Sequence, residues 1–401
     1  MRILLISGAN IAASGGDAVH TLGMAGGLAG NGARVTLVLR GCFQGPGRPS
    51  IRVVGLPATG NKYLDALIWP VLVCLVAVFL TLLRDYDAVY IRDSIYEAPL
   101  VLLLRLFGKT VILEVNAVTA EDLGTRKRAT WKVVLSRRLQ RRACLSATLV
   151  LPVTTSLARW LAEQGVDSGR MAVVPNGANP YLYRPRDRRD CLAGLGLDPS
   201  KRILCFAGNL APWQGGEMIL EAFGGLARNH PEAALLMIGD GQVKKELEVK
   251  ARRLGVGDRV VFAGRLPYDR VPLAINACVA GIGGGWYGGN KIVERRFRYT
   301  GSSALKVYSY LACGLPVVVP DIPDLAGTVR RERCGQVVAP DRVEKLEEAL
   351  RVILEDPRHW AEAGLRGRAY IEREASWECR AAQVLSLLER AKGSRTGGVH
   401  K

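Results

Sequence analysis

Short apolar runs alternate with longer helical patterns along the chain, and this alternation constrains the fold more than any other feature. RILLIS, RVTLVL, IRVVGL, DAVYIR, TVILEV and ATLVLP come first, separated by stretches long enough for crossover helices. RILCFAG, AALLMIG, RVVFAG, CVAGIG, PVVVP and GQVVAP form a second set. Repeated βαβ units predict parallel sheets covered on both faces by helices. The sequence therefore predicts an α/β protein with two doubly wound, Rossmann-like domains.

The two sets of predicted strands are divided near residue 173. VVPNGANPYLYRPRDRRD combines Asn-Gly, three prolines and a run of charges, which is typical of turns and linkers. We expect an N-terminal domain over residues 1–180, a C-terminal domain over 181–376, a helix over 377–392 that returns to the first domain, and a flexible tail over 393–401. Two facing domains would place the ligand-binding loops at the carboxyl ends of both sheets along one cleft.

The balance of charge favours an anionic partner. The 401 residues carry 55 Lys and Arg against 37 Asp and Glu, a net charge of +18. Nucleic acid, a phosphate-bearing ligand or an acidic membrane surface would each suit this excess. The absence of helix-turn-helix, RNP and zinc-finger patterns argues against nucleic acid. Nine scattered cysteines, with no C-x-x-C, and an apolar start too short for a signal peptide predict a reduced, cytoplasmic protein.

Two segments of the first half are candidates for membrane contact. Residues 66–83 are 18 consecutive residues without a charge. A transmembrane span would separate strands of one sheet, so we expect either a buried helix or a helix with one face in the membrane interface. Residues 126–142 contain eight basic residues and no acidic one, with an apolar stripe of Trp131, Val134, Leu135 and Leu139. Its cations are either a solvated helix face or an electrostatic contact with anionic lipid, which would use Arg137, Arg138, Arg141 and Arg142.

A series of motifs gives the chain a family resemblance. Gly15 and Gly16 end a loop after the first predicted strand, where their N–H groups suit either a phosphate or an ordinary turn. LEVNA (113–117), VVPNGAN (173–179), AGNLAPWQG (207–215), IGDG (238–241), RVVFAGRLP (259–267) and SALKVYSYLACGLPVV (303–318) follow in order. In these motifs the chain resembles family 4 glycosyltransferases of the GT-B fold. The resemblance implies a nucleotide-sugar donor bound mainly by the second domain, an acceptor held by the first, retention of anomeric configuration, and no metal or other cofactor.

The resemblance also implies a set of donor-binding residues. They are Gly15, Gly16, Asn209, Gln214, Gly239, Leu266, Gly285, Ser303, Leu305 and Ser309. Asn209 and Gln214 stand where the family pattern has an Arg and a Lys, and Gly301 and Ser309 stand where it has two glutamates. Lys306 matches a lysine of one branch of the family, where it would contact a phosphate; a surface lysine is the alternative.

Two further segments bear on the chemistry. The glycine-rich segment 281–300, with Lys291, Arg295, Arg296 and Arg298, either rebuilds a phosphate cradle or is a mobile surface loop. Glu114 and Asn116 lie on one face at the end of a predicted central strand, and Glu121 follows. Glu114 is either functional or paired with a cation such as Arg92. We predict Glu114, Asn116 and Lys306 as catalytic residues and interpret His20 as a packing residue.

These features predict a glycosyltransferase on the cytoplasmic face of a membrane. Its partners would be a nucleotide-sugar donor, a lipid-linked or cell-envelope polysaccharide acceptor and an anionic membrane surface, with no nucleic acid. Two alternatives remain open. A non-catalytic binding protein of the same fold would fit the departures at Asn209, Gln214, Gly301 and Ser309. A sugar-nucleotide epimerase of the same fold would act on the donor without any acceptor.

Overall fold

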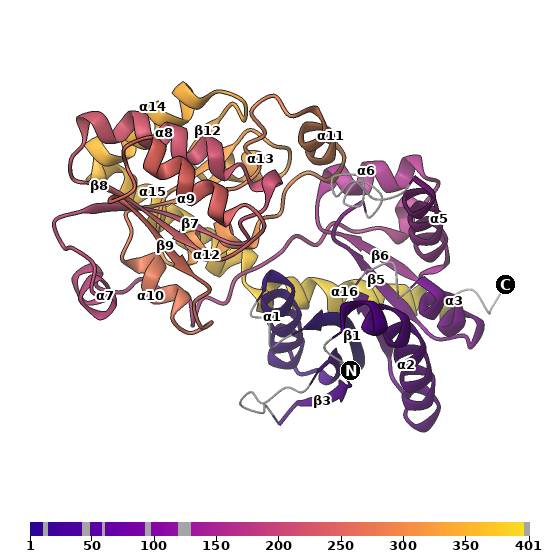
Figure 1. Ribbon diagram of the computed structural model, residues 1–401. Helices are drawn as coiled ribbons and strands as arrows, with labels where there is room; N and C mark the ends of the chain where they lie inside the picture. The colour runs from indigo at the N-terminus through magenta and orange to yellow at the C-terminus, as the bar shows by residue number, and fades with distance from the viewer. Residues whose placement is uncertain (11–14, 42–48, 58–60, 93–97, 119–129, 397–401) are drawn as a thin grey trace. The chain divides into compact units, whose positions relative to one another are not determined.

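The computed structural model describes residues 1–10, 15–41, 49–57, 61–92, 98–118 and 130–396. It divides into two compact units (Figure 1). The first unit comprises Met1–Pro175 together with Trp377–Lys401, and the second comprises Asn176–Ser376. The change of unit between residues 175 and 176 lies inside the proline-containing linker sequence.

The first unit is built on a six-stranded parallel sheet in the order β3-β2-β1-β4-β5-β6. The strands are β1 (Arg2–Asn10), β2 (Arg34–Arg40), β3 (Ile51–Leu56), β4 (Ala88–Arg92), β5 (Val111–Val115) and β6 (Leu149–Pro152). All five residues of β5 are buried, as expected for a strand covered on both faces. The order reverses between β1 and β4, which creates the topological switch point where α/β proteins bind ligands.

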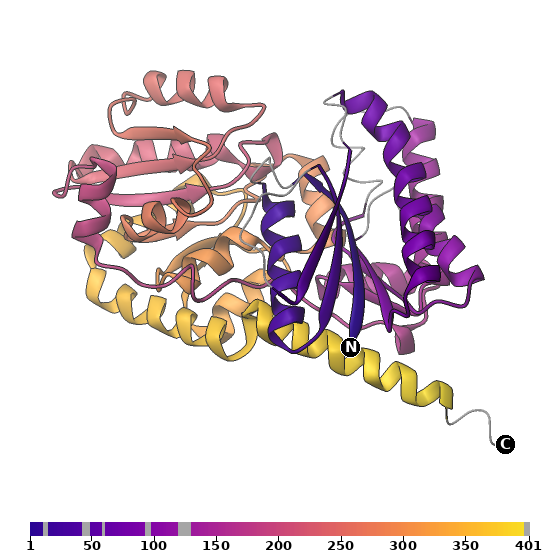
Figure 2. The same ribbon diagram turned by 90° about the horizontal axis from the view of Figure 1, so that it is seen from below.

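Helices cover both faces of this sheet. They are α1 (Gly16–Gly30), α2 (Lys62–Leu83), α3 (Ala98–Leu106), α5 (Thr130–Ser146), α6 (Thr155–Glu163) and α16 (Trp377–Thr396), with a short 3-10 turn η2 (Ser168–Arg170). Figure 2 shows α1 on one face of the sheet and α2 and α3 on the other. The helix α16 packs against α1 and continues to Thr396, beyond the expected helix end at residue 392.

The second unit repeats the same topology. Its six parallel strands lie in the order β12-β11-β10-β7-β8-β9. They are β7 (Arg202–Ala207), β8 (Ala233–Ile238), β9 (Val260–Gly264), β10 (Ala280–Ile282), β11 (Val317–Pro320) and β12 (Gly335–Val338). The switch point of this sheet lies between β7 and β10. Every apolar run predicted as a strand overlaps one of these strands or those of the first unit, which confirms the predicted α/β fold with two doubly wound sheets.

The second unit has helices between and after its strands. They are α7 (Arg188–Leu195), η3 (Pro212–Gln214), α8 (Gly216–Asn229), α9 (Lys244–Arg253), α10 (Val271–Asn276), α11 (Lys291–Thr300), α12 (Leu305–Ala312), α13 (Leu325–Glu332), α14 (Val343–Glu355), α15 (Pro357–Tyr370) and the π-helical turn η4 (Ile371–Ala375). Two buried apolar clusters hold them to the sheet. Both clusters include residues of the β-strands, so the sheet of the second unit is packed against helices through a buried apolar core.

Candidate functional site

The switch point of the second unit brings Lys306 to the carboxyl edge of the sheet. Lys306 is the second residue of α12, and its Nζ donates to Gln214 Oε1 at 2.7 Å. The same Nζ lies 3.9 Å from the centroid of the Phe206 ring, which belongs to β7. The structure therefore brings together Lys306 and Gln214, which the sequence assigned separately to the chemistry and to donor binding.

Glycines make room for this lysine. A Cβ atom on Gly208, directly after β7, would lie 2.9 Å from Lys306 Cε. A Cβ on Gly284, just after β10, would lie 3.0 Å from Lys306 Nζ and 1.9 Å from Gln214 Oε1. Real Cβ atoms do not approach so closely, so any larger residue would displace the ammonium group. The glycines on both sides of the switch point are therefore matched to the position of Lys306.

The environment of Lys306 changes its ionisation. Burial among β7, η3 and the chain after β10 lowers the pKa of Lys306 to about 7. Burial disfavours the charged form of the lysine. The Gln214 oxygen carries no net charge, so it does not offset this effect as a carboxylate would. An arriving anion would supply the missing counter-charge. The geometry therefore places a titratable amine beside a neutral partner at the carboxyl edge of the sheet.

The remaining predicted glycines keep the backbone segments close together. Gly239, after β8, has φ 132°, and a Cβ there would lie 1.9 Å from the carbonyl oxygen of Gly208. Gly285 has φ 106°, a region that glycine adopts readily. Asn209, which follows Gly208 after β7, is exposed, and a Cβ on Gly241 would lie 2.5 Å from its Oδ1. The ends of β7 and β8 are thus joined by direct backbone contact.

The hydroxyl groups near α12 serve local structure. Ser303 Oγ accepts a hydrogen bond from Asn176 N at 2.9 Å, and the carbonyl of Ser303 accepts one from Asn176 Nδ2 at 2.5 Å. Ser309 Oγ donates to the carbonyl of Leu305, one turn earlier, at 3.1 Å. Leu266 packs, partly buried, against the apolar core. These residues shape the edge of the sheet around Lys306.

Gly301 explains why no glutamate stands at its position. Its backbone has φ 58° and ψ −159°, a combination that is essentially restricted to glycine. A side chain there would strain the end of α11. The departure from the family pattern at this position is therefore built into the backbone and is more than a change of side chain.

The glycine-rich segment is anchored at its start. Residues 281–286 are buried, and the Trp286 indole Nε1 donates to the carbonyl of Gly283 at 2.8 Å. Lys291 and Arg298 both contact Glu294 within α11, at 3.0 Å and 3.4 Å. The expectation of a mobile surface loop does not describe residues 281–286, which pack against the second unit's core.

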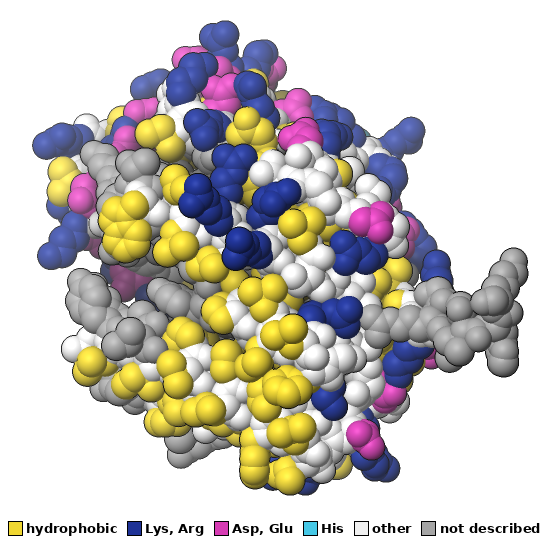
Figure 3. Space-filling model, turned by 90° about the vertical axis from the view of Figure 1, so that its right-hand side faces the viewer, with side chains coloured by type: hydrophobic (Ala, Val, Ile, Leu, Met, Phe, Trp, Pro, Cys, Tyr) yellow, Lys and Arg dark blue, Asp and Glu magenta, His cyan; other side chains and the backbone are white. Residues whose placement is uncertain are grey.

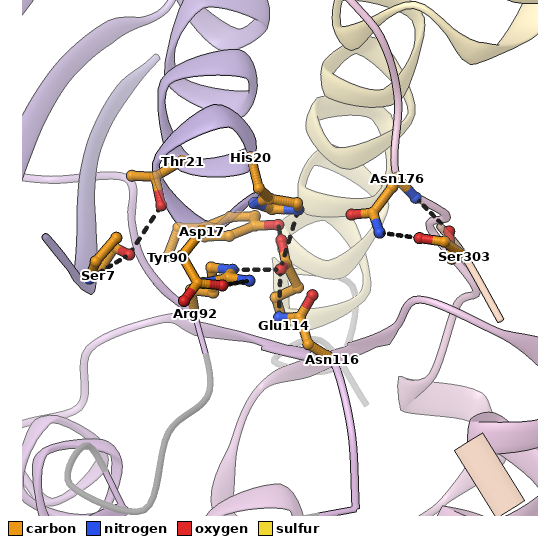
Figure 4. A network of polar contacts seen from close by, with 11 residues as sticks. Ser7, Asp17, His20, Thr21, Tyr90, Arg92, Glu114, Asn116, Asn176 and Ser303 are labelled. Atoms are coloured by element: carbon orange, nitrogen blue, oxygen red, sulfur yellow. Dashed lines mark hydrogen bonds and ion pairs between the residues drawn. The ribbon is translucent and has the colours of Figure 1, made fainter. Parts of the chain in front are cut away.

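The first unit has its own polar cluster at the carboxyl edge of the sheet, centred on Glu114 (Figure 4). Glu114, at the end of β5, is 2% exposed. Its Oε2 accepts from the Tyr90 hydroxyl at 2.5 Å, and its Oε1 accepts from Asn116 Nδ2 at 2.7 Å. Arg92 Nε lies 3.5 Å from Oε1, so the carboxylate has the cationic partner that the sequence left open. The half-buried Asn116 is the more accessible of the two predicted residues.

His20 belongs to this cluster and is more than a packing residue. Its Nε2 lies 3.2 Å from Glu114 Oε1, and its ring meets the Trp377 ring edge-on, with centroids 4.9 Å apart. Burial lowers the pKa of His20 to about 4, although the charge of Glu114 favours protonation. His20 is therefore neutral at pH 7 and donates from Nε2, while its buried Nδ1 meets no partner among the described residues.

Asp17 extends the cluster to the start of α1. Its Oδ1 accepts from Arg92 Nη2 at 2.9 Å. Burial opposes the charge on Arg92, but Asp17 and Glu114 raise its pKa. Gly15 lies just before α1, and its carbonyl accepts from the N–H groups of Ala18 and Val19. Asp17 lies in the first turn of α1. Its negative charge is therefore balanced by Arg92 as well as by the N-terminus of the helix.

Asp17, His20 and Tyr90 were not predicted as site residues. The spacing of Asp17 and His20 places both on one face of a helix, which is the signal that could have found them. Tyr90 carried no comparable signal, because an aromatic residue in a buried strand usually packs in the core. Glu121, the alternative to Glu114 and Asn116, lies outside the described residues.

The basic helix α5 is exposed where the sequence predicted a membrane contact. Arg137 and Arg141 donate to the side-chain and main-chain oxygens of Gln164. Arg138 and Arg142 are exposed, and no carboxylate of the described residues pairs with any of these four arginines. Residues 126–128 of the basic segment lie outside the described part. Within that part, no cluster of His, Cys, Asp and Glu suited to a metal ion is present.

Two family models match the chain. The model described as "Glycosyl transferase 4-like domain" matches residues 15–177, and that described as "Glycosyl transferases group 1" matches residues 187–370. The D-inositol 3-phosphate glycosyltransferase of Rhodococcus jostii is 28% identical over 240 residues, which are 58% of this chain and 50% of the relative. A GDP-mannose-dependent phosphatidylinositol monomannoside mannosyltransferase of Mycolicibacterium smegmatis is 29% identical over 58% of this chain and 56% of its own length. The aligned parts thus span about half of these relatives.

Solved structures share the fold over nearly the whole chain. The sucrose-phosphate synthase of Thermosynechococcus elongatus has a TM-score of 0.79 at 20% identity and covers 98% of this chain and 99% of its own. HepE of Anabaena in complex with UDP has a TM-score of 0.69 at 18% identity and covers 97% and 100%. At these identities the likeness concerns the fold alone.

Proposed function

Because this chain belongs to family 4 of the glycosyltransferases, with the GT-B fold, we propose that it transfers a sugar from a nucleotide-sugar donor to a lipid-linked or cell-envelope polysaccharide acceptor. The observation that carries the proposal is the half-buried Lys306 at the switch point of the second unit, with its pKa lowered to about 7. A basic side chain with a neutral hydrogen-bond partner, at the carboxyl edge of the sheet, suits a diphosphate.

Lys306 and Gln214 would stabilise the leaving group. Transfer breaks the bond between the sugar and the diphosphate, so negative charge develops on the departing phosphate oxygen. The Lys306 amine would take up a proton as the diphosphate binds, and the resulting ammonium would stabilise that negative charge. Gln214 uses its Oε1 for Lys306, which leaves its amide N–H groups to donate to phosphate oxygens. We propose a retaining reaction without a metal ion, in which Lys306 supplies the positive charge.

The first unit would hold the acceptor beside Asn116. The Asn116 amide is oriented by Glu114, which itself is fixed by Tyr90, Arg92 and His20. In this role Asn116 would accept a hydrogen bond from an acceptor hydroxyl, and Glu114 would be a positioning residue. The named relatives act on inositol phosphate or phosphatidylinositol mannosides. An acceptor that carries a phosphate suits a chain with a net charge of +18.

The proposed location of the enzyme is the cytoplasmic face of a membrane, to which it would bind peripherally. Arg137, Arg138, Arg141 and Arg142 lie exposed on α5, where they could meet anionic headgroups. Within the described residues, no helix combines the length and apolar character needed to cross a bilayer. A peripheral attachment would bring the enzyme to a lipid-linked acceptor.

A non-catalytic binding protein is the second candidate, because Gly301 has a backbone that excludes the family's glutamate. Product analysis separates the candidates, with the epimerase as a third outcome. The protein is incubated with UDP-, GDP- and ADP-sugars, with and without phosphatidylinositol vesicles, and products are identified by mass spectrometry. We expect one nucleoside diphosphate released per sugar added, and only with acceptor. A changed sugar nucleotide without acceptor would indicate an epimerase, and binding without any product would indicate a non-catalytic protein.

A further inference from the structure

The helix α2 is apolar on two opposite sides. One side faces the core of the first unit through Trp69, Val73, Ala77 and Leu80, all at most 9% exposed. The other side forms an exposed stripe, here called the α2 stripe, with exposed fractions from 37% to 69%. It consists of Leu64, Ile68, Val71, Leu75, Phe79, Leu82 and Leu83. The sequence left a buried helix and an interfacial helix as alternatives, and the structure shows a helix that is buried on one side only.

The spacing of the stripe excludes a chance scatter of apolar residues. From Leu64 to Leu82 its members follow one another by three or four positions, so they share one face of the helix, and Leu83 adjoins this face at the helix end. Single exposed apolar side chains are common on protein surfaces, whereas a continuous patch marks an interaction site. Keeping seven large apolar side chains in water is unfavourable, and a partner that removes them from water would be bound.

Neighbouring helices extend the stripe into a mixed apolar and basic face. The helix α3 packs against both α2 and α5. It ends at Leu106, which is 84% exposed, followed by Phe107 at 52%. On α5, the exposed Trp131, Val134 and Leu135 accompany the four arginines. Figure 3 shows apolar side chains gathered on the lower part of this view, with Lys and Arg side chains above them.

We propose that α2 is an interfacial anchor, which lies in the plane of an anionic bilayer with the α2 stripe below the headgroups. This inference deepens the proposed membrane attachment and rests on it. The apolar stripe matches the acyl boundary of a bilayer, and the α5 arginines match its anionic phosphates. Stable peripheral anchoring takes two membrane-binding signals. This face supplies an apolar one, the α2 stripe, and an electrostatic one, the α5 arginines.

The charges on the face favour lipid over a second copy of the chain. The helix α5 contains no acidic residue. Asp65, the acidic residue of α2, is buried and paired with Arg40. Two copies that met through this face would bring like charges together without a compensating carboxylate on α5 or an exposed one on α2. An anionic bilayer provides the opposite charge.

The experiment measures sedimentation with vesicles made of equal parts phosphatidylcholine and phosphatidylglycerol. Leu75→Glu with Phe79→Glu places two carboxylates in the stripe, where the originals are 64% and 60% exposed. The matched control is Ile292→Glu with Leu365→Glu in the second unit, where the originals are 57% and 59% exposed. We expect the stripe variant to partition at least tenfold less and the control to partition like the wild type. Leu75→Ser with Phe79→Ser, which adds no charge, should show a smaller loss in the same direction.

A separate pair of variants tests the electrostatic part. Arg138→Glu with Arg142→Glu should weaken binding to these vesicles at least fivefold, since each basic residue near an anionic surface contributes about fivefold. Arg252→Glu with Arg253→Glu, on the exposed face of α9, is the control and should change binding little. Added salt should weaken wild-type binding without abolishing it, because the apolar contribution of the α2 stripe is not screened.

Two results would overturn the anchor. Wild-type partitioning by the folded Leu75→Glu, Phe79→Glu protein would show that the stripe does not enter the bilayer. A wild-type dimer in solution that this double variant dissociates, without any loss of vesicle binding, would show that the stripe contacts a second copy. Nucleoside diphosphate binding in solution, measured on the same proteins, distinguishes these failures from a failure of the proposed transferase.

Discussion

Lys306 combines a position next to the switch point with a pKa lowered to about 7, and both properties bear on ligand binding. Because a diphosphate binds the charged ammonium, binding should draw a proton onto Lys306. Above pH 7 the affinity for a nucleoside diphosphate should therefore fall, by up to about tenfold per pH unit, until the pKa of the complex is reached.

Calorimetric titrations at pH 6.5 and pH 8.5 check this prediction. Lys306→Gln should bind weakly at both values and lose the pH dependence. The control is Lys345→Gln, which removes a lysine whose side chain is 65% exposed on α14, and this variant should keep the pH dependence of the wild type. An affinity of the wild type that does not change between these pH values would show that Lys306 does not charge on binding.

The lowered pKa of His20 predicts that the first unit loses stability in acid. Burial lowers its pKa to about 4 in the folded protein, against 6.5 in the unfolded chain. Between these values only the unfolded chain takes up the proton, so stability is retained above pH 6.5 and falls as the pH drops toward 4. The loss from this residue should be of the order of 3 kcal/mol.

Urea unfolding at a series of pH values tests whether the free energy of unfolding falls as the pH drops. His20→Gln keeps a donor toward Glu114 without titrating, so its stability should fall less steeply than that of the wild type between pH 6.5 and pH 4. Parallel curves for the two proteins would mean that His20 is not the titrating group.

At the residue scale, the sequence predicted part of the candidate site. Gln214 and Lys306 were both named, but their mutual hydrogen bond depends on residues 92 positions apart and could not be read from spacing. The resemblance pointed to the missing glutamates, whereas the backbone of Gly301 that excludes one appears only in three dimensions. His20 was underestimated, because its partner Glu114 lies on another element.

At the scale of elements, α1 and α16 show why close packing matters. A Cβ atom on Gly27 would lie 2.3 Å from the carbonyl oxygen of Trp377. Backbone cannot move away as a flexible side chain can, so Gly27→Ala should separate the two helices and lower stability by about 1–3 kcal/mol or more.

Thermal unfolding measures this effect. Gly30→Ala on the same helix is the matched control, because its Cβ would come no closer than 3.7 Å to a neighbour, Glu378 Cγ. We expect the unfolding midpoint to fall for Gly27→Ala and to stay level or rise slightly for Gly30→Ala. Equal midpoints would mean that the helices tolerate separation at this point.

The elements themselves could be predicted well, for a physical reason. Buried parallel strands need continuous apolar runs, and these runs are readable without a structure, as in β5 and β8. The helix α2 was harder, because an apolar sequence does not state which of its sides meets the core. Only packing through residues such as Val73 and Ala77 fixes that side and leaves the α2 stripe exposed.

At the scale of the whole molecule, each unit has its own six-stranded parallel sheet with the same strand order. Each also carries charged groups at the carboxyl edge, Lys306 in one and the Glu114 cluster in the other. This division of charged groups fits a donor held by the second unit and an acceptor by the first. We propose that the edge around Lys306 binds the diphosphate of a sugar nucleotide.

Calorimetric titration of the full chain with UDP, GDP and ADP at pH 6.5 measures diphosphate binding at this edge. We predict saturable binding of one nucleoside diphosphate, weakened at least tenfold in Lys306→Ala and unchanged in Lys345→Ala. Binding that Lys306→Ala leaves intact, or a folded wild-type protein that binds none of the three nucleotides, would show that the edge around Lys306 is not a diphosphate site.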